Sequence, residues 1–281
     1  MDSSSTDRWH EIKGPFTAKD LAALGAHESI VQLSITGQPL VTALVAKGLS
    51  KIKAVDRLWL WCDVTRAAMK YVVAIPKLRI LDVLLVKSPG RLTGFSDAMH
   101  LQEFRCPHCL NDSDLVEISS CISLRELGAQ GCQITPAALD ALLGLPHLES
   151  LDLEGSNFDD QLATQLRGNE SLRHLDIGST AVTRKGIEAL VELKHLRELD
   201  LWATRIDERD LDLLAELPHL EYLSVGQGYD DGKQIFNPAT LLPRLTAMPS
   251  LKRVWLDGVV LSAAEKAVFE KHFEELRVTC D

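Results

Sequence analysis

The stretch that decides the fold is LRELDLWATRIDERDLDLLAELPHL, residues 196–220. Its first six residues follow the pattern L-x-x-L-x-L, which predicts a short strand with its leucines on one face. The second half places Leu211, Leu214 and Leu217 three residues apart, which predicts a helical segment. A single strand and helix cannot bury these leucines, so the segment needs neighbours of the same kind.

The same pattern recurs along most of the chain. The best-matched blocks lie 24 residues apart and start at Leu124, Leu148, Leu172, Leu196 and Leu220. Looser copies start at Ile30, Val55, Leu78, Leu101 and Leu251. Ten units therefore lie between residues 30 and 261, and a near-constant step of this kind predicts a repeat architecture.

This pattern resembles the leucine-rich repeat, in its bacterial or cysteine-containing (ribonuclease-inhibitor-like) form of 23–24 residues. The resemblance implies an α/β solenoid shaped as a horseshoe, with a parallel sheet on the concave face. Thr135-Pro136 predicts a helix start, with Thr as the N-cap and Pro in the first turn. Equivalent helix starts are expected at Asp159, Thr183 and Asp207.

The ends of a solenoid must be closed, because an open end exposes core leucines. Residues 1–29 are expected to hold a disordered start (1–8) and an N-terminal capping helix (17–25). The repeats fill 30–261. A C-terminal cap follows over 262–281, with a helix beginning after Ser262 and a last short strand at 276–278.

Composition limits the function. The 281 residues include 30 Lys and Arg against 40 Asp and Glu, a net charge of −10. This acidity argues against nucleic-acid binding, which depends on neutralising phosphates. No apolar run approaches the roughly 20 residues of a membrane span, so no membrane association is expected. The N-terminus lacks a signal-peptide pattern and cysteines are few, which favours a reduced, cytoplasmic protein.

Acidic residues gather at strand positions that point away from the core. Asp152, Asp176 and Asp200 occupy the same position in consecutive repeats, and Glu154 and Glu198 fall nearby. Like charges on neighbouring strands cost stability. Two interpretations stand: each Asp is a solvated consensus residue, or the row is an acidic patch for a basic partner.

Tryptophan shows a similar bias. Four of the five tryptophans fall at outward strand positions, namely Trp59, Trp61, Trp202 and Trp255, and Tyr222 joins them. Exposed aromatic residues are enriched in binding sites. The alternative is that some of these rings pack under loops or caps.

Two further features of the sequence bear on where a functional site could lie. The insertion at 228–236 is expected at the rim of the concave face, where loops often carry function. The Cys106-Pro-His-Cys109 sequence resembles half of a zinc site, but a second pair is missing and Cys106 replaces a core leucine. We therefore expect no metal, no cofactor and no catalytic centre.

The sequence predicts a non-enzymatic protein–protein interaction module. Its partner is expected to be a basic protein held on the concave face by the acidic and aromatic residues named above. One alternative is an inhibitor or immunity protein that neutralises a toxin or nuclease. Another is a structural or adaptor subunit of a larger assembly.

Overall fold

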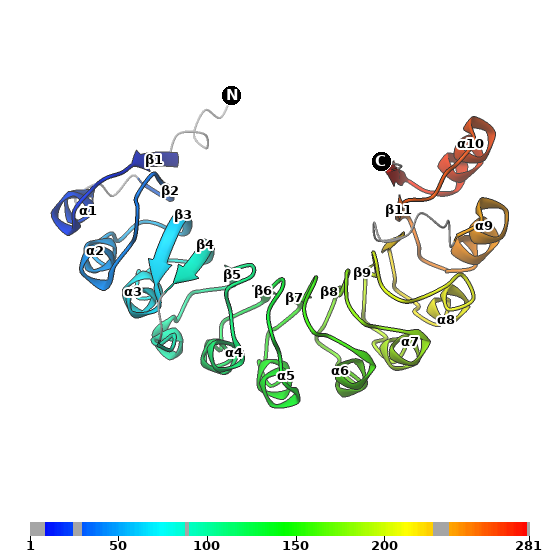
Figure 1. The fold of residues 1–281 in the computed structure, drawn as a ribbon, viewed down its shortest axis with the longest axis horizontal. Helices are drawn as coiled ribbons and strands as arrows, with labels where there is room; N and C mark the ends of the chain where they lie inside the picture. Colours follow the sequence, from blue (N-terminus) through cyan, green and yellow to red (C-terminus); the bar gives the residue numbers. More distant parts are fainter. Residues whose placement is uncertain (1–8, 25–29, 88–89, 227–235, 280–281) are drawn as a thin grey trace, which may run out of the picture. The chain divides into compact units, whose positions relative to one another are not determined.

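The computed structural model describes residues 9–24, 30–87, 90–226 and 236–279. Its contacts divide the chain after residue 148 into two compact units, here called unit 1 and unit 2. Each unit is described by itself. In both, short strands alternate with helices along the chain (Figure 1).

Unit 1 holds the looser repeats and the first of the well-matched ones, and it begins with a strand and helix pair that precedes them all. Its strands pair in parallel with their neighbours in chain order, and the helices lie on one side of the sheet (Figure 1). The elements are β1 (Trp9–Lys13), α1 (Ala18–Leu24), β2 (Gln32–Thr36), α2 (Ala43–Leu49), β3 (Arg57–Thr65), α3 (Arg66–Val72), β4 (Ile80–Lys87), the 3₁₀ helix η1 (Phe95–Asp97), β5 (Glu103–Arg105), α4 (Asp112–Ile118), β6 (Glu126–Gly128) and α5 (Pro136–Leu143).

Unit 2 has the same construction, and its strands also pair in parallel in chain order. The elements are β7 (Ser150–Asp152), α6 (Asp160–Gln165), β8 (His174–Asp176), α7 (Arg184–Leu190), β9 (Glu198–Asp200), α8 (Leu211–Leu214), β10 (Tyr222–Gly226), α9 (Pro238–Thr246), β11 (Arg253–Asp257), α10 (Ala263–His272) and β12 (Glu275–Thr279). Strands β2 to β11 fall at the ten repeat starts that the sequence predicts, which confirms the α/β leucine-rich-repeat fold.

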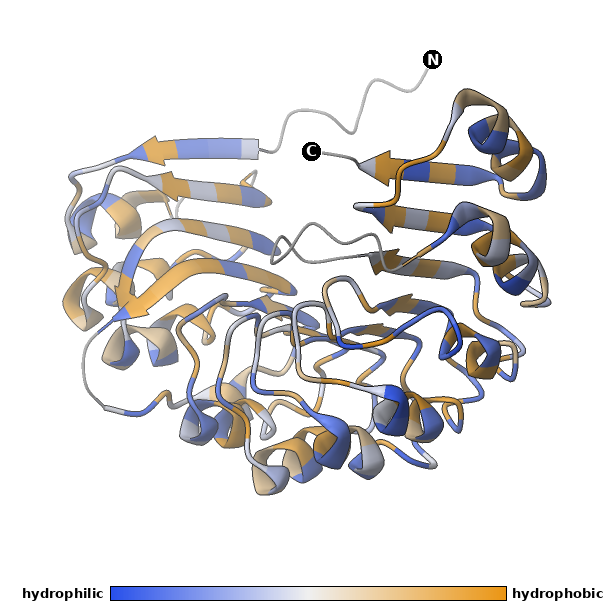
Figure 2. Cartoon of the chain, turned by 45° about the vertical axis from the view of Figure 1, so that its right-hand side comes forward, coloured by the Kyte–Doolittle hydropathy of each residue, from blue (hydrophilic) through white to orange (hydrophobic). Residues whose placement is uncertain are grey.

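The core lies between each sheet and its helices. Along unit 2, Leu151, Leu175 and Leu199 are paired in register and are each at most 2% exposed. Figure 2 shows the strands banded by alternating hydrophobic and hydrophilic residues, as a one-sided sheet requires. Burying one such leucine contributes roughly 2 kcal/mol, so stacking repeats supplies the stability that one repeat lacks.

The helix starts follow the predicted capping residues with one exception. Thr135, Asp159 and Thr183 each accept a backbone N–H of the first helical turn. The prediction for Asp207 is wrong, because α8 begins at residue 211 and its N-cap is Asp210. Asp207 instead accepts the Arg209 N–H at 2.7 Å, and its own N–H donates to Asp210, so a turn precedes the helix.

Helices also form in the two segments for which the sequence predicts caps. Helix α1 lies within the expected capping segment, and Ser262 forms a capping box with Glu265 at the start of α10. Strand β12 extends the predicted strand at 276–278. Strand β1 was not predicted, and residues 1–8 lie outside the described part of the chain. The same holds for the insertion at 228–236, apart from the buried Phe236.

Candidate functional site

The open face of the unit 2 sheet, opposite the helices, carries the predicted acidic row. Asp152 pairs with Asp176, and Asp176 pairs with Asp200, in the parallel register of β7, β8 and β9. Neighbouring strands lie about 5 Å apart. The structure therefore brings these three carboxyl groups side by side.

Each of these aspartates also has a local structural role. Its Oδ1 accepts the backbone N–H two residues further on: from Glu154 at 3.1 Å, from Gly178 at 2.9 Å and from Trp202 at 2.8 Å, respectively. Such bonds hold the turn that ends a strand. The consensus interpretation of the row thus has a physical basis, and it is compatible with a binding role.

Burial changes the charge of the row. It raises the pKa of the Asp176 carboxyl to about 8, assisted by repulsion from Asp200, while the Gly178 N–H opposes the shift. Burial also raises the pKa of Asp200, against the hydrogen bonds from the Trp202 N–H and from Ser224. At neutral pH the row is therefore less negative than three aspartates in sequence suggest.

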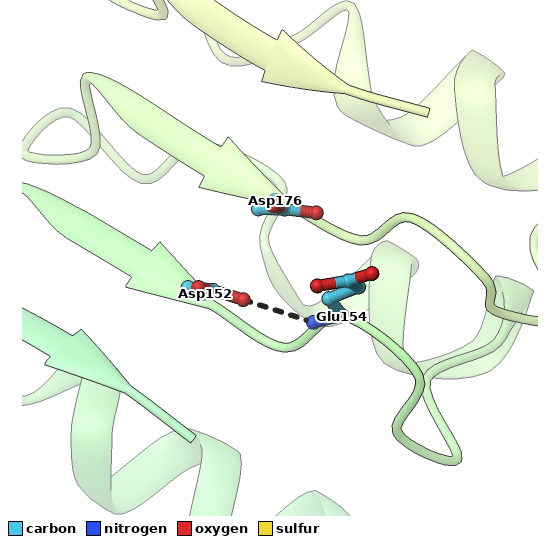
Figure 3. Close-up of side chains that lie close together, drawn as sticks. All are labelled: Asp152, Glu154 and Asp176. Atoms are coloured by element: carbon cyan, nitrogen blue, oxygen red, sulfur yellow. Dashed lines mark hydrogen bonds between the residues drawn. The ribbon is translucent and has the colours of Figure 1, made fainter. Parts of the chain in front are cut away.

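Three acidic side chains converge at the start of this row. One carboxylate oxygen each from Asp152, Glu154 and Asp176 lies within 4.8 Å of the others (Figure 3). Oxygen ligands of this kind suit Ca²⁺ or Mg²⁺. Acidic groups gather this way on many surfaces that hold no ion, so we assign no metal to them.

A pocket of about 370 Å³ opens beside the acidic row. Trp202 and Trp255 contribute indole rings to its lining. The Trp202 Nε1–H donates to Asp257 Oδ2 at 2.5 Å, and the Trp255 Nε1–H donates to Thr279 Oγ1 at 3.4 Å. The remaining lining residues are Glu154, Asp176, Gly178, Asp200 and Ser224.

Both tryptophans point outward as predicted, but neither is freely exposed. They are half-buried, and the hydrogen bonds to Asp257 and Thr279 fix their indoles. Sequence reasoning did not select Asp257, Thr279, Ser224 or Gly178. Asp257 stands at the same repeat position as Trp202, two repeats later, so the register offered a signal for it.

Glu198 and Tyr222, also predicted for the site, are engaged within the chain. Arg253 donates to Glu198 at 2.6 Å, and its guanidinium lies 5.2 Å from the centre of the Tyr222 ring. Burial, followed by the Asp200 charge, raises the pKa of Tyr222 to about 12. His174 lies 3.3 Å from Glu198 on the other side. These residues lie near the pocket but are not among those that line it.

Trp59 and Trp61 belong to unit 1. Both lie on β3, where Trp61 is 53% exposed and Trp59 is half-buried beside Asp82. Leu84 on the neighbouring strand is 48% exposed. The structure thus places these two tryptophans together, in a different unit from the acidic row.

The cysteine prediction needs a correction. Cys106 and Cys109 form a disulfide, so the expectation of a fully reduced chain is wrong at this pair. Cys106 is nonetheless buried in the core, as the repeat register predicted, and Cys62, Cys121 and Cys132 are buried thiols that form no disulfide. Because disulfides are typical of oxidising compartments, this pair weakens the argument for a cytoplasmic location.

Comparison with known proteins supports the repeat assignment. Residues 154–236 match the family model for the leucine-rich repeats of the FBD-associated F-box protein At5g56370. No curated protein sequence matches the chain. In the part of the chain that the structure describes, no helix is long and apolar enough to cross a membrane.

Solved structures share the fold. The internalin InlF of Listeria monocytogenes aligns over 94% of this chain and 84% of its own, with 15% identity and a TM-score of 0.53. TLR13, solved in complex with ssRNA13, aligns over 98% of this chain with 18% identity and a TM-score of 0.57. This chain spans only 44% of the TLR13 chain.

The solved structures and the matched repeats define the class of fold: this chain has the leucine-rich-repeat fold, and its residues 154–236 match a leucine-rich-repeat family model. Proteins of this class generally act as scaffolds for protein–protein interaction, with extended surfaces made of stacked repeats. The open face of each unit is therefore the place to look for a binding site.

Proposed function

We propose that this chain is a protein-binding module that holds a basic surface of a partner protein against the open face of unit 2. The observation that carries the proposal is the pocket beside the acidic row, which combines two indole rings with four carboxyl groups. Aromatic rings supply desolvated contact area, and carboxylates steer and orient a basic partner.

The charge of the chain supports the same partner. A net charge of −10 favours association with basic proteins and disfavours nucleic acid. The RNA in the TLR13 structure belongs to that protein and does not alter this argument. On unit 1, the exposed Trp61 and Leu84 form a separate apolar area that is suited to protein contact.

The biological role depends on the partner's identity. An inhibitor or immunity protein would occupy the active surface of a basic toxin or nuclease, and its association rate would fall steeply with salt. An adaptor would instead remain bound to a stable assembly. Both the inhibitor role and the adaptor role use the same face of unit 2. The proposal also includes a cytoplasmic location for the protein.

The test is a synthetic peptide array of basic, neutral and acidic sequences, probed with the purified chain. The binding variant replaces Asp152, Asp176 and Asp200 with Asn and Glu154 with Gln. Asn keeps a side-chain oxygen for each turn-closing hydrogen bond. The matched control replaces the same number of carboxyl groups, at the exposed residues Glu170, Glu188, Glu216 and Glu270 of unit 2, with Gln.

We expect a subset of basic peptides to bind the wild type and the control but not the binding variant. Their binding should weaken severalfold when ionic strength rises from about 0.05 M to about 0.5 M. Equal loss in both variants would show attraction by net charge alone. Binding confined to neutral or acidic peptides would contradict the proposal.

A further inference from the structure

The open face of unit 2 already binds guanidinium groups of its own chain. Arg253 pairs with Glu198 at 2.6 Å and lies 5.2 Å from the Tyr222 ring centre. Arg277 pairs with Glu275 at 2.8 Å and lies 5.9 Å from the Trp255 ring centre. The surface thus twice combines an arginine with one carboxylate and one aromatic ring.

The pocket beside the acidic row has the same two components, and Arg277, which lies near its Trp255 ring, is not among its lining residues. Its nine lining residues, all in the described part of unit 2, include two tryptophans and four acidic residues but no lysine or arginine. We infer that this pocket binds the side chain of one arginine supplied by the partner protein. The inference rests on the proposed function and specifies what anchors the partner.

The acidic groups of the pocket suit a cation. Asp176 and Asp200 lie side by side, and burial raises the pKa of both carboxyl groups. A positive charge placed between them stabilises the ionised form of both carboxyl groups and so opposes the effect of burial. The structure favours a charged ligand over an apolar one for this reason.

The walls of the pocket favour arginine over lysine. A guanidinium is planar, stacks on aromatic faces and donates through a rigid fork, whereas an ammonium is a compact, strongly hydrated charge. Asp257 holds the Trp202 indole at 2.5 Å and also accepts a hydrogen bond from Thr279. This fixed ring lowers the entropy lost on binding.

The pocket also has limited room beside the carboxyl groups of Asp176 and Asp200. A Cβ added at Gly178 would lie 3.2 Å from the Trp202 carbonyl oxygen and 3.3 Å from Oδ1 of both Asp176 and Asp200. Glycine at this position therefore keeps the carboxyl groups accessible from the pocket. Gly178→Ala should restrict this access.

The experiment uses three small probes on the purified full chain: Nα-acetyl-arginine amide, its lysine counterpart, and its citrulline counterpart. Citrulline has nearly the shape of arginine without the charge. Binding is followed by NMR through the indole N–H resonances, with Trp202 and Trp255 assigned from their Phe variants. The Trp61 resonance in unit 1 serves as an internal control.

We expect the arginine probe to shift the Trp202 and Trp255 resonances along a saturable curve and to leave Trp61 unchanged. The lysine probe should bind about tenfold more weakly, and the citrulline probe should cause no saturable shift. Asp200→Asn, which keeps an acceptor for the Trp202 N–H, should weaken arginine binding about tenfold. Glu216→Gln should not change it.

The inference is overturned if the Trp202 and Trp255 resonances stay in place, or if citrulline shifts them as strongly as arginine. Either result leaves the proposed function intact when the array still shows basic peptides lost by the binding variant. In the opposite case, arginine binds the pocket but no peptide depends on the acidic row. The pocket assignment then stands and the basic-partner proposal fails.

Discussion

Replacing Asp176 with Asn tests whether the buried carboxyl group keeps its proton at neutral pH. Asn has nearly the same shape and keeps an oxygen that accepts the Gly178 N–H, which Asp176 binds at 2.9 Å. The amide does not titrate. The variant therefore removes one ionisable group and leaves the turn after β8 in place.

The magnitude follows from the pKa of Asp176, which rises from 3.8 to about 8 on folding. Between these values the folded chain holds a proton that the unfolded chain has released. Unfolding then releases a proton, so the free energy of unfolding falls as pH rises. The slope is about 1.4 kcal/mol per pH unit, or roughly 3 kcal/mol between about pH 5 and about pH 7. Asp176→Asn abolishes this contribution.

The assay is urea unfolding followed by circular dichroism at several pH values across this range. We expect Asp176→Asn to gain stability relative to the wild type as pH rises, and to be the more stable protein near neutral pH. Glu216→Gln, which removes an exposed charge of the same unit, should follow the wild type throughout. Parallel pH profiles for the wild type and Asp176→Asn would refute the assignment of a protonated Asp176.

Three further predictions concern stability and are checked by chemical unfolding. Asp114→Asn should cost about 3–5 kcal/mol, because it leaves Arg66 without the buried carboxylate that it contacts at 2.8 Å; a loss below about 1 kcal/mol would contradict this. Leu199→Ala, in the buried row of unit 2, should cost about 2–5 kcal/mol; little change in the free energy of unfolding would mean that neighbouring core side chains move in to fill the cavity. Gly226→Ala should destabilise by about 1–3 kcal/mol, because its Cβ would overlap the Asp257 carbonyl oxygen at 2.4 Å; a stable variant would show that β10 and β11 can separate.

The fold could be predicted because its information is local and repeated. Each strand shows its buried face through alternate leucines, and each helix start at Thr135, Asp159 and Thr183 shows a capping side chain. The one wrong helix start, at Asp207, lies where a second aspartate follows three residues later. Asp207 does accept the Arg209 N–H, but a separate turn lies between it and α8, and sequence spacing alone does not distinguish such a turn from the first turn of a helix.

The sequence predicts the face of the sheet on which the candidate site lies, but not the interactions among its side chains. The repeat register correctly places Asp176, Asp200 and Trp202 on the outward face of unit 2. It does not show that Trp202 donates to Asp257, which lies 55 residues further along the chain. It also cannot give the charge of Asp176, since that depends on how neighbouring repeats exclude water.

The contrast between two rows of the same sheet explains why the repeat consensus alone does not define a binding surface. The row through Glu198 and Tyr222 receives Arg253 from within the chain, which satisfies its carboxylate. The row through Asp176 and Asp200 continues through Trp255 to Arg277, while the lining of the pocket itself has no basic residue. Identical strand geometry thus yields one surface whose charges are paired internally and one that gains most from a cation brought by another molecule. Side chains that depart from the consensus, Arg253 and Trp255 among them, make this difference.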